Sequence, residues 1–229
     1  MAPDQDYKKK KLIMEALTDS PSAFTFSFDS SQTSGGSPFN AVAPTPISEW
    51  PAVKVNDDFF WSTQTTGVRF GKEASNSFVF PYDDYYNTGG VKKGVYTILD
   101  TGASAIYISS LWFDSFMDVL EEVAGTRLEP HEGRTYARCV NSFPPLYFQM
   151  SGHWIELAVK DYVIDVSRLQ DGSICLIQVM RTDAPFNIYG MPLFVDYTTA
   201  FDDEASTISF KSTNGSLKSD LEPDSGRPA

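Results

Sequence analysis

Short segments of alternating apolar and polar residues, separated by turn-forming residues, constrain the fold of this 229-residue sequence more than any other feature. Residues 23–28, for example, alternate with a period of two, which is the pattern of a half-buried strand. Segments of this kind recur along the chain with Gly, Pro, Asn, Asp and Ser between them, as in all-β folds. Further strands are predicted at residues 53–55, 59–70, 77–80, 95–99, 146–150, 154–159, 162–166, 173–179, 186–189 and 207–210.

Residues 110–125 break this pattern, because their apolar side chains recur at helical spacing and share one face. The residues of this face are Phe113, Phe116, Leu120 and Val123. Ser110 can cap the start of the helix, and Gly125 can end it. A shorter helix is predicted at residues 8–17, where a lysine run leads into apolar residues. We therefore expect an all-β fold that carries one or two short helices.

The charge of the chain argues against several classes of partner. Thirty acidic and 18 basic residues give a net charge of -12, and such a surface repels nucleic-acid phosphates and anionic lipid. No stretch approaches the roughly 20 apolar residues of a membrane-spanning helix. The lysine run at residues 8–11 is followed by only three apolar residues, which is too few for a signal peptide. We expect no nucleic-acid partner.

The most informative motif begins with an apolar strand, residues 95–99, that leads directly into Asp100 and a turn of sequence Thr-Gly-Ala-Ser. Gly102 lets the backbone bend sharply and lets another backbone come close. The hydroxyls of Thr101 and Ser104 can hold a carboxylate oxygen in place. These residues alone leave two interpretations open: a strand that ends in an Asx-type turn, or a carboxylate positioned for catalysis.

Other catalytic and binding motifs are not supported by the sequence. Its two histidines and two cysteines lack the spacing of zinc ligands. Ile106 occupies the position of the second glycine in a Gly-x-Ser-x-Gly elbow around Ser104. Residues 67–72 are too short for a phosphate-binding loop. We expect neither a metal nor a cofactor, and we interpret His131, in the predicted loop 129–134, as a surface residue.

Further along the chain, an apolar strand ends in a glycine, a Phe-Asp pair follows, and a last strand closes the pattern. These segments are Ile188-Tyr189-Gly190, Phe201-Asp202 and Ile208-Ser209-Phe210. With the Asp100 motif and the helix after it, they make the chain resemble the C-terminal lobe of the pepsin-like aspartic proteases, peptidase family A1. In that family the aspartate strand is threaded against the strand that ends in glycine. The resemblance covers residues 59–211, with a fainter similarity in residues 8–58.

The resemblance implies a fold, a site and a disulfide. The fold is an all-β pepsin-like lobe of partly orthogonal sheets with one or two short helices. Asp100 is the implied catalytic residue, and Cys139 and Cys175 fall where this lobe usually carries its disulfide. The implied supporting residues of the site are Thr101, Gly102, Ser104, Ile188, Tyr189 and Gly190. Two residues depart from the family: Ala103 replaces a hydroxyl residue that contacts substrate, and Met191 replaces the usual Asp. These departures put cleavage efficiency in question rather than fold.

The resemblance also implies an organisation of the chain and a set of partners. Residues 59–211 are the C-terminal lobe, residues 1–58 are a remnant of the N-terminal lobe with the inter-lobe connector, and residues 212–229 are a disordered tail. The partners are a peptide or protein substrate and an N-terminal lobe that supplies a second aspartate. The family indicates a secretory, lysosomal or vacuolar location, which the residues of this chain do not specify.

Hydrolysis of a peptide bond explains why a second aspartate is needed. The attacking water must lose a proton while the carbonyl oxygen gains one, and two adjacent carboxylates that share one proton supply both roles. We therefore predict an aspartic endopeptidase lobe that is inactive without its partner. Two alternatives remain: a non-catalytic pepsin-like module that binds peptides or proteins, and a homodimer of the retroviral type in which each copy supplies Asp100.

Overall fold

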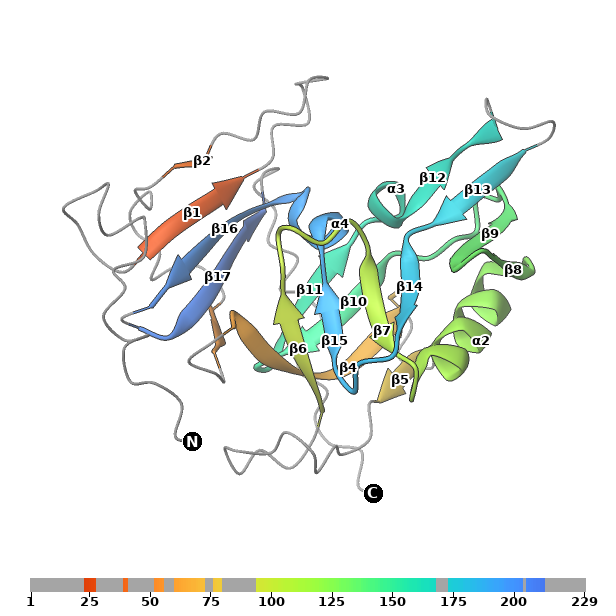
Figure 1. The fold of residues 1–229 in the computed structure, drawn as a ribbon. Helices are drawn as coiled ribbons and strands as arrows, with labels where there is room; N and C mark the ends of the chain where they lie inside the picture. The colour runs from red at the N-terminus through yellow and green to blue at the C-terminus, as the bar shows by residue number, and fades with distance from the viewer. Residues whose placement is uncertain are drawn as a thin grey trace.

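The computed structural model describes residues 23–27, 39–40, 52–55, 60–72, 76–79, 94–167, 173–203 and 205–212. These residues build three β-sheets and a few short helices, so the predicted all-β fold is confirmed (Figure 1). The predicted helix at residues 8–17 and the predicted tail after residue 212 lie outside the described residues, as does most of the segment 1–58.

The first sheet joins strands from the two ends of the chain. Its order is β2(Phe39–Asn40), β1(Ala23–Ser27), β16(Tyr197–Asp202), β17(Thr207–Ser212) and β3(Ala52–Lys54), with all neighbours antiparallel. The C-terminal hairpin β16–β17 is therefore flanked on both sides by strands from the first 55 residues. The sequence pattern predicted a strand at β17, but it did not predict β16.

The central sheet carries the Asp100 motif. Its order is β11(His153–Leu157), β10(Leu146–Met150), β4(Ser62–Phe70), β6(Val95–Leu99), β15(Asn187–Tyr189), β7(Ile106–Ser109) and β14(Val179–Thr182), and β5(Ser77–Val79) pairs with β4. Strand β15 lies between β6 and β7, which are neighbours in the sequence (Figure 1). It runs parallel to β6 and antiparallel to β7. This insertion places the end of β15 next to the turn that follows β6.

The third sheet lies beside the central one and has the order β12(Val163–Asp165), β13(Ile174–Ile177), β9(Arg134–Arg138) and β8(Leu128–His131). Residues 129–134 were predicted to be a loop. Residues 129–131 instead belong to β8 and residue 134 begins β9, so the turn of this hairpin consists of residues 132 and 133. The turn is possible because Glu132 and Gly133 both adopt positive φ, at 49° and 74°. The predicted disulfide is confirmed: Cys139 is bonded to Cys175, with a Cα–Cα distance of 5.1 Å.

The predicted helix after β7 is present as α2(Phe113–Ala124), but it begins later than expected. Its N-cap is Trp112, not Ser110, and no side chain caps it. The N–H of Ser110 instead donates to the carbonyl of Thr182 at 2.8 Å, which extends the pairing of β7 with β14. The predicted end is confirmed, because Gly125 adopts a left-handed φ of 63° and its N–H donates to the Glu121 carbonyl.

Two single-turn helices replace predicted loop or strand. The helix α3(Val159–Tyr162) ends the strand that was predicted to continue to residue 159, and α4(Met191–Phe194) directly follows β15. In α4, Pro192 stands in the first turn, where a missing N–H costs nothing.

One apolar core joins the sheets and α2. The predicted helix face is confirmed, with Phe116 and Leu120 fully buried and Phe113 and Val123 packed at its margin. Phe116 lies against Phe70 of β4 with ring centroids 5.0 Å apart. Each side chain of this size contributes about 1.5–3 kcal/mol on burial. The core therefore fixes α2 against β4 of the central sheet.

We predict that replacing both Cys139 and Cys175 with serine lowers the free energy of unfolding by roughly 3–4 kcal/mol. The bond closes a loop with a sequence separation of 36, and opening it gives the unfolded chain more conformational freedom. Urea denaturation of the two proteins measures the difference. Equal midpoints, or two thiols that react with iodoacetamide in the non-reduced wild-type protein, would contradict this prediction.

Candidate active site

Asp100 follows the last residue of β6, and its backbone is held from the two neighbouring strands. Its N–H donates to the carbonyl of Tyr189 in β15 at 2.9 Å. One residue earlier, the N–H of Leu99 donates to the carbonyl of Trp61, just before β4, at 2.7 Å. The side chain of Asp100 is exposed. The central sheet thus fixes the backbone of this aspartate and leaves its carboxylate accessible.

A backbone N–H of the turn after Asp100 holds the carboxylate. The N–H of Gly102 donates to Oδ1 of Asp100 at 2.8 Å, and the N–H of Ala103 donates to the Asp100 carbonyl at 3.2 Å. The Thr101 and Ser104 hydroxyls were expected to bond near this carboxylate, but within the described part of the chain neither donates to it. The backbone amide takes this place because it is fixed by the turn, whereas a hydroxyl has to be ordered as a rotamer.

Gly190 locks this turn to β15. Its N–H donates to the carbonyl of Ala105 at 3.1 Å, and the N–H of Met191 donates to the carbonyl of Ala103 at 2.7 Å. A Cβ at residue 190 would lie 2.3 Å from the Ala103 carbonyl oxygen and 2.4 Å from that of Ala105. Only glycine allows the two backbones to approach this closely. The structure therefore brings Gly190 and Asp100, predicted from segments far apart in the sequence, onto one end of the central sheet.

Ile188 and Tyr189 fix this end of β15 through strand pairing and through burial in the core. Ile188 pairs with Ile98 on one side and Tyr107 on the other. Tyr189 is fully buried and stacks on Phe148 with ring centroids 4.3 Å apart. Burial raises the pKa of the Tyr189 phenol, and the side chains of Thr65, Asn187 and Thr97 offset only part of that rise, so the ring stays neutral. Tyr189 acts as core under the site.

Several groups that hold the site were not found from the sequence. The Thr65 and Thr97 hydroxyls bond each other at 2.9 Å inside the sheet. The amide oxygen of Asn187 accepts the Ser109 N–H at 3.0 Å, which ties β15 to β7. The only available signal was their polarity, which does not distinguish a buried pair from an exposed residue.

The model of the eukaryotic aspartyl proteases matches residues 4–213. This chain belongs to the eukaryotic aspartyl protease family. No curated protein sequence matches the chain. The match covers both the segment interpreted as an N-terminal remnant and the segment interpreted as the C-terminal lobe, and it does not assign the family domain to one lobe.

Within the residues that the structure describes, no three His, Cys, Asp or Glu side chains gather in a way that could hold a metal ion. In the same part of the chain, no helix is long and apolar enough to cross a membrane.

A charged cluster joins the two short helices behind the Gly190 strand. Lys160 of α3 donates to Asp161 at 3.0 Å and to Asp196, just after α4, at 2.6 Å. Burial raises the pKa of Asp161 to about 6; the hydrogen bond from Lys160 opposes this rise, and the charge of Asp196 adds to it. Two carboxylates therefore share Lys160, close to the end of α4, the helix that connects β15 to β16 of the first sheet.

We predict that Gly190→Ala destabilises the aspartyl protease domain by at least about 3 kcal/mol, because the added Cβ meets two carbonyl oxygens of a fixed turn. Gly133→Ala is the matched control: it also adds a methyl group, but nothing lies within 4 Å of that position. It should cost only the left-handed backbone strain, about 1–2 kcal/mol. Urea denaturation of both variants tests this, and equal losses would contradict the proposed close approach.

We predict that Asp161→Asn reduces the loss of stability between pH 4 and pH 6. The folded-state pKa of Asp161 lies above the ordinary value, so the folded protein holds this proton more tightly than the unfolded chain does. That contribution is complete below about pH 4 and is lost as the pH rises through about 6. Urea midpoints of wild type, Asp161→Asn and the exposed control Asp203→Asn at both pH values measure it. A wild-type pH dependence that Asp161→Asn leaves unchanged would contradict the prediction.

Proposed function

We propose that this chain supplies the C-terminal lobe of an aspartic endopeptidase, with Asp100 as one of the two carboxylates that hydrolyse a peptide bond. The observation that carries the proposal is the Asp100 carboxylate itself. It is exposed at the end of a central strand, its backbone is bonded to β15, and its Oδ1 accepts the Gly102 N–H. In a member of the eukaryotic aspartyl protease family, a carboxylate fixed in this way is suited to act on a water molecule.

The residues around Asp100 define what it can do. A hydrogen bond from the Gly102 N–H to Oδ1 fixes which oxygen of the carboxylate is free. The free oxygen can accept a proton from water, while a second carboxylate close by holds the proton that the carbonyl oxygen needs. The sequence contains one Asp-Thr-Gly, so in this proposal the second carboxylate comes from an N-terminal lobe. An extended peptide would bind between the two lobes.

The first sheet supports the proposed division of the chain. Strands β1 and β3, from residues 1–58, flank the hairpin β16–β17 instead of joining the sheet that carries Asp100. This arrangement suits a segment that connects two lobes. It suits a homodimer less well, because a two-fold partner would have to approach the Asp100 face while each copy also accommodates this asymmetric segment.

A non-catalytic pepsin-like module is the second candidate function. The single Asp-Thr-Gly favours it for the chain acting alone, because one carboxylate cannot be both the base and the proton donor. Such a module would bind a peptide along the Asp100 face without cutting it. The two functions share a surface and differ in the need for a second carboxylate.

We predict that the purified chain alone shows no cleavage of a denatured protein above background at about pH 4, where a pair of carboxylates holds one proton. Adding an N-terminal pepsin-like lobe that binds the chain should restore cleavage. Asp100→Asn in this chain should then reduce that activity by at least about a thousandfold. Asp203→Asn, which alters an exposed carboxylate in the β16–β17 turn, is the control and should keep full activity.

Other outcomes of the same assay discriminate between the alternatives. Cleavage by the chain alone that is lost in Asp100→Asn would support the homodimer. A matched lobe that binds without any cleavage at acidic pH would support the non-catalytic module.

A further inference from the structure

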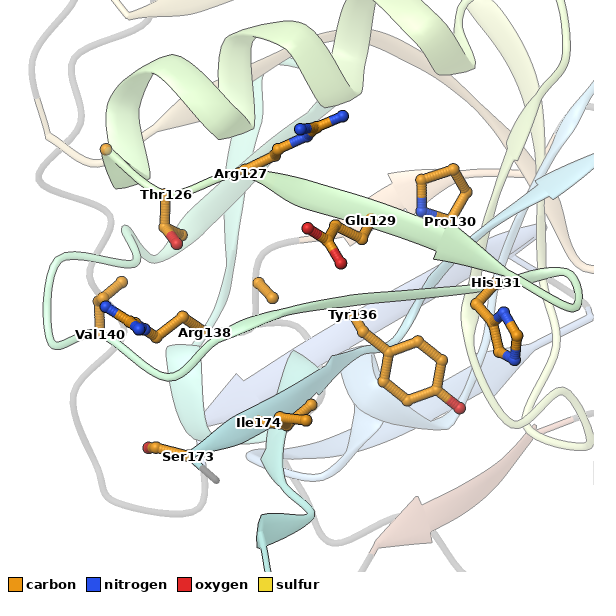
Figure 2. A pocket seen from close by; sticks show the side chains of 12 residues that line it. Thr126, Arg127, Glu129, Pro130, His131, Tyr136, Arg138, Val140, Ser173 and Ile174 are labelled. Atoms are coloured by element: carbon orange, nitrogen blue, oxygen red, sulfur yellow. The ribbon is translucent and has the colours of Figure 1, made fainter. Parts of the chain in front are cut away.

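A groove on the third sheet lies apart from the Asp100 site. It is formed by the end of α2, the hairpin β8–β9 and the start of β13, and its volume is about 900 Å³ (Figure 2). None of its lining residues belongs to the turn 100–105 or to residues 188–191. A cleft of this size accommodates several residues of a peptide. The proposed protease chemistry makes no use of it.

The charge of the groove is opposite to that of the chain. The whole sequence carries a net charge of -12, yet the groove is lined by Arg127, Arg138 and His131, and Glu129 is the one carboxylate among its lining residues. Within the described part of the chain, no ion pair joins Arg127 or Arg138 to a carboxylate. Guanidinium groups that are not already paired are well suited to bind carboxylates of a partner.

Strand β9 places Arg138 of the groove in a row with a further cation, Arg134, which lies next to the groove and not among its lining residues. Successive side chains of a strand point to opposite faces, so Arg134, Tyr136 and Arg138 share one face of the sheet. On this face Ile174 of β13 pairs with Arg138, and the ring of His131 lies 6.4 Å from that of Tyr136. Figure 2 shows the Tyr136 and His131 side chains together at one end of the groove and Arg138 toward the other. The row is therefore cation, half-buried aromatic ring, cation.

The spacing of this row matches that of an extended peptide. Residues two apart on a strand are separated by about 6.6–6.8 Å, so the backbones of Arg134 and Arg138 are roughly 13 Å apart. A peptide in extended conformation has the same repeat. It can place acidic side chains at positions i and i+4 over the two arginines, with an apolar side chain at i+2 over Tyr136.

We propose that this groove, together with Arg134 at the adjoining start of β9, binds an extended acidic segment of a protein, of the pattern acidic-x-apolar-x-acidic, through Arg134, Arg138 and the apolar floor at Tyr136. Glu129, opposite Tyr136 in the hairpin, is the one carboxylate among the lining residues of the groove, and it opposes such a ligand. The proposal does not depend on Asp100. A protease lobe could use the groove to hold an acidic part of a substrate away from the bond that is cut.

The test measures binding of a labelled peptide, Gly-Glu-Gly-Leu-Gly-Glu-Gly, by fluorescence anisotropy at low salt. We expect the Glu-to-Gln version of the peptide, and the double variant Arg134→Gln with Arg138→Gln, each to bind about tenfold more weakly or worse. Glu129→Gln should bind the acidic peptide about two- to fivefold more tightly, since it removes like charge. Raising the salt to about 0.5 M should weaken wild-type binding as strongly as the arginine substitutions do.

Two controls separate this site from general charge and from the proposed catalysis. Lys54→Gln with Lys72→Gln removes the same charge from exposed positions outside the groove and should change the affinity by less than about twofold. Asp100→Asn should leave peptide binding unchanged, so failure of the protease assay and failure of this proposal are distinguishable. The altered arginines are exposed, and an unchanged urea midpoint verifies that the variant is folded.

Three outcomes would overturn the proposal. Equal binding of the Glu and Gln peptides would exclude charge recognition. Equal loss in the lysine control would show a general electrostatic effect. A wild-type dimer that the arginine substitutions convert to monomer in sedimentation velocity would assign this face to a second copy of the chain.

Discussion

The close approach of Gly190 to the turn after Asp100 is the constraint on which the site depends. Residues 188–190 must enter between β6 and β7, two strands that their own connection would otherwise bring together. Once inserted, β15 accepts the Asp100 N–H through the Tyr189 carbonyl, and Gly190 and Met191 donate to the carbonyls of Ala105 and Ala103. The position of the carboxylate is thus set by backbone contacts between distant segments, and a single methyl group at residue 190 would separate them.

Features with a local cause were predictable from the sequence. The bounds of β6 and β10 agree with the predicted apolar strands, and Gly125 ends α2 because left-handed backbone is intrinsic to glycine. Features that depend on pairing were not. Ser110 resembles a helix cap, but its N–H is bonded to Thr182 of a strand whose position the local pattern does not specify. The β8–β9 hairpin was missed because its residues are mostly exposed, so the alternation is weak there.

The same distinction applies within the candidate site. Asp100, Gly102 and Gly190 were identified because the aspartate follows an apolar strand and the glycines permit unusual backbone contacts. The groups that hold Asp100 are the Tyr189 carbonyl and the Gly102 amide, and the Trp61 carbonyl holds Leu99 one residue earlier. Backbone groups leave no signature in residue type. Hydroxyls were expected in their place, since Thr101 and Ser104 are visible in the sequence while an amide is not. Side-chain chemistry suggested the right turn but the wrong donor.

The disulfide and the arginine groove lie on the third sheet, whereas Asp100 lies at the end of a strand of the central sheet. Cys139 follows β9 directly, and its N–H donates to the Ser173 carbonyl at 3.1 Å. Cys175 is in β13 and pairs with Ala137 of β9. The bond therefore fastens β9 to β13 next to Arg138 and Ile174, and it preorganises the row of side chains that faces the groove. Asp100 is held instead by β4 and β15 of the central sheet. Loss of the disulfide should loosen the groove more than the carboxylate, because the backbone bonds that hold Asp100 do not pass through the third sheet.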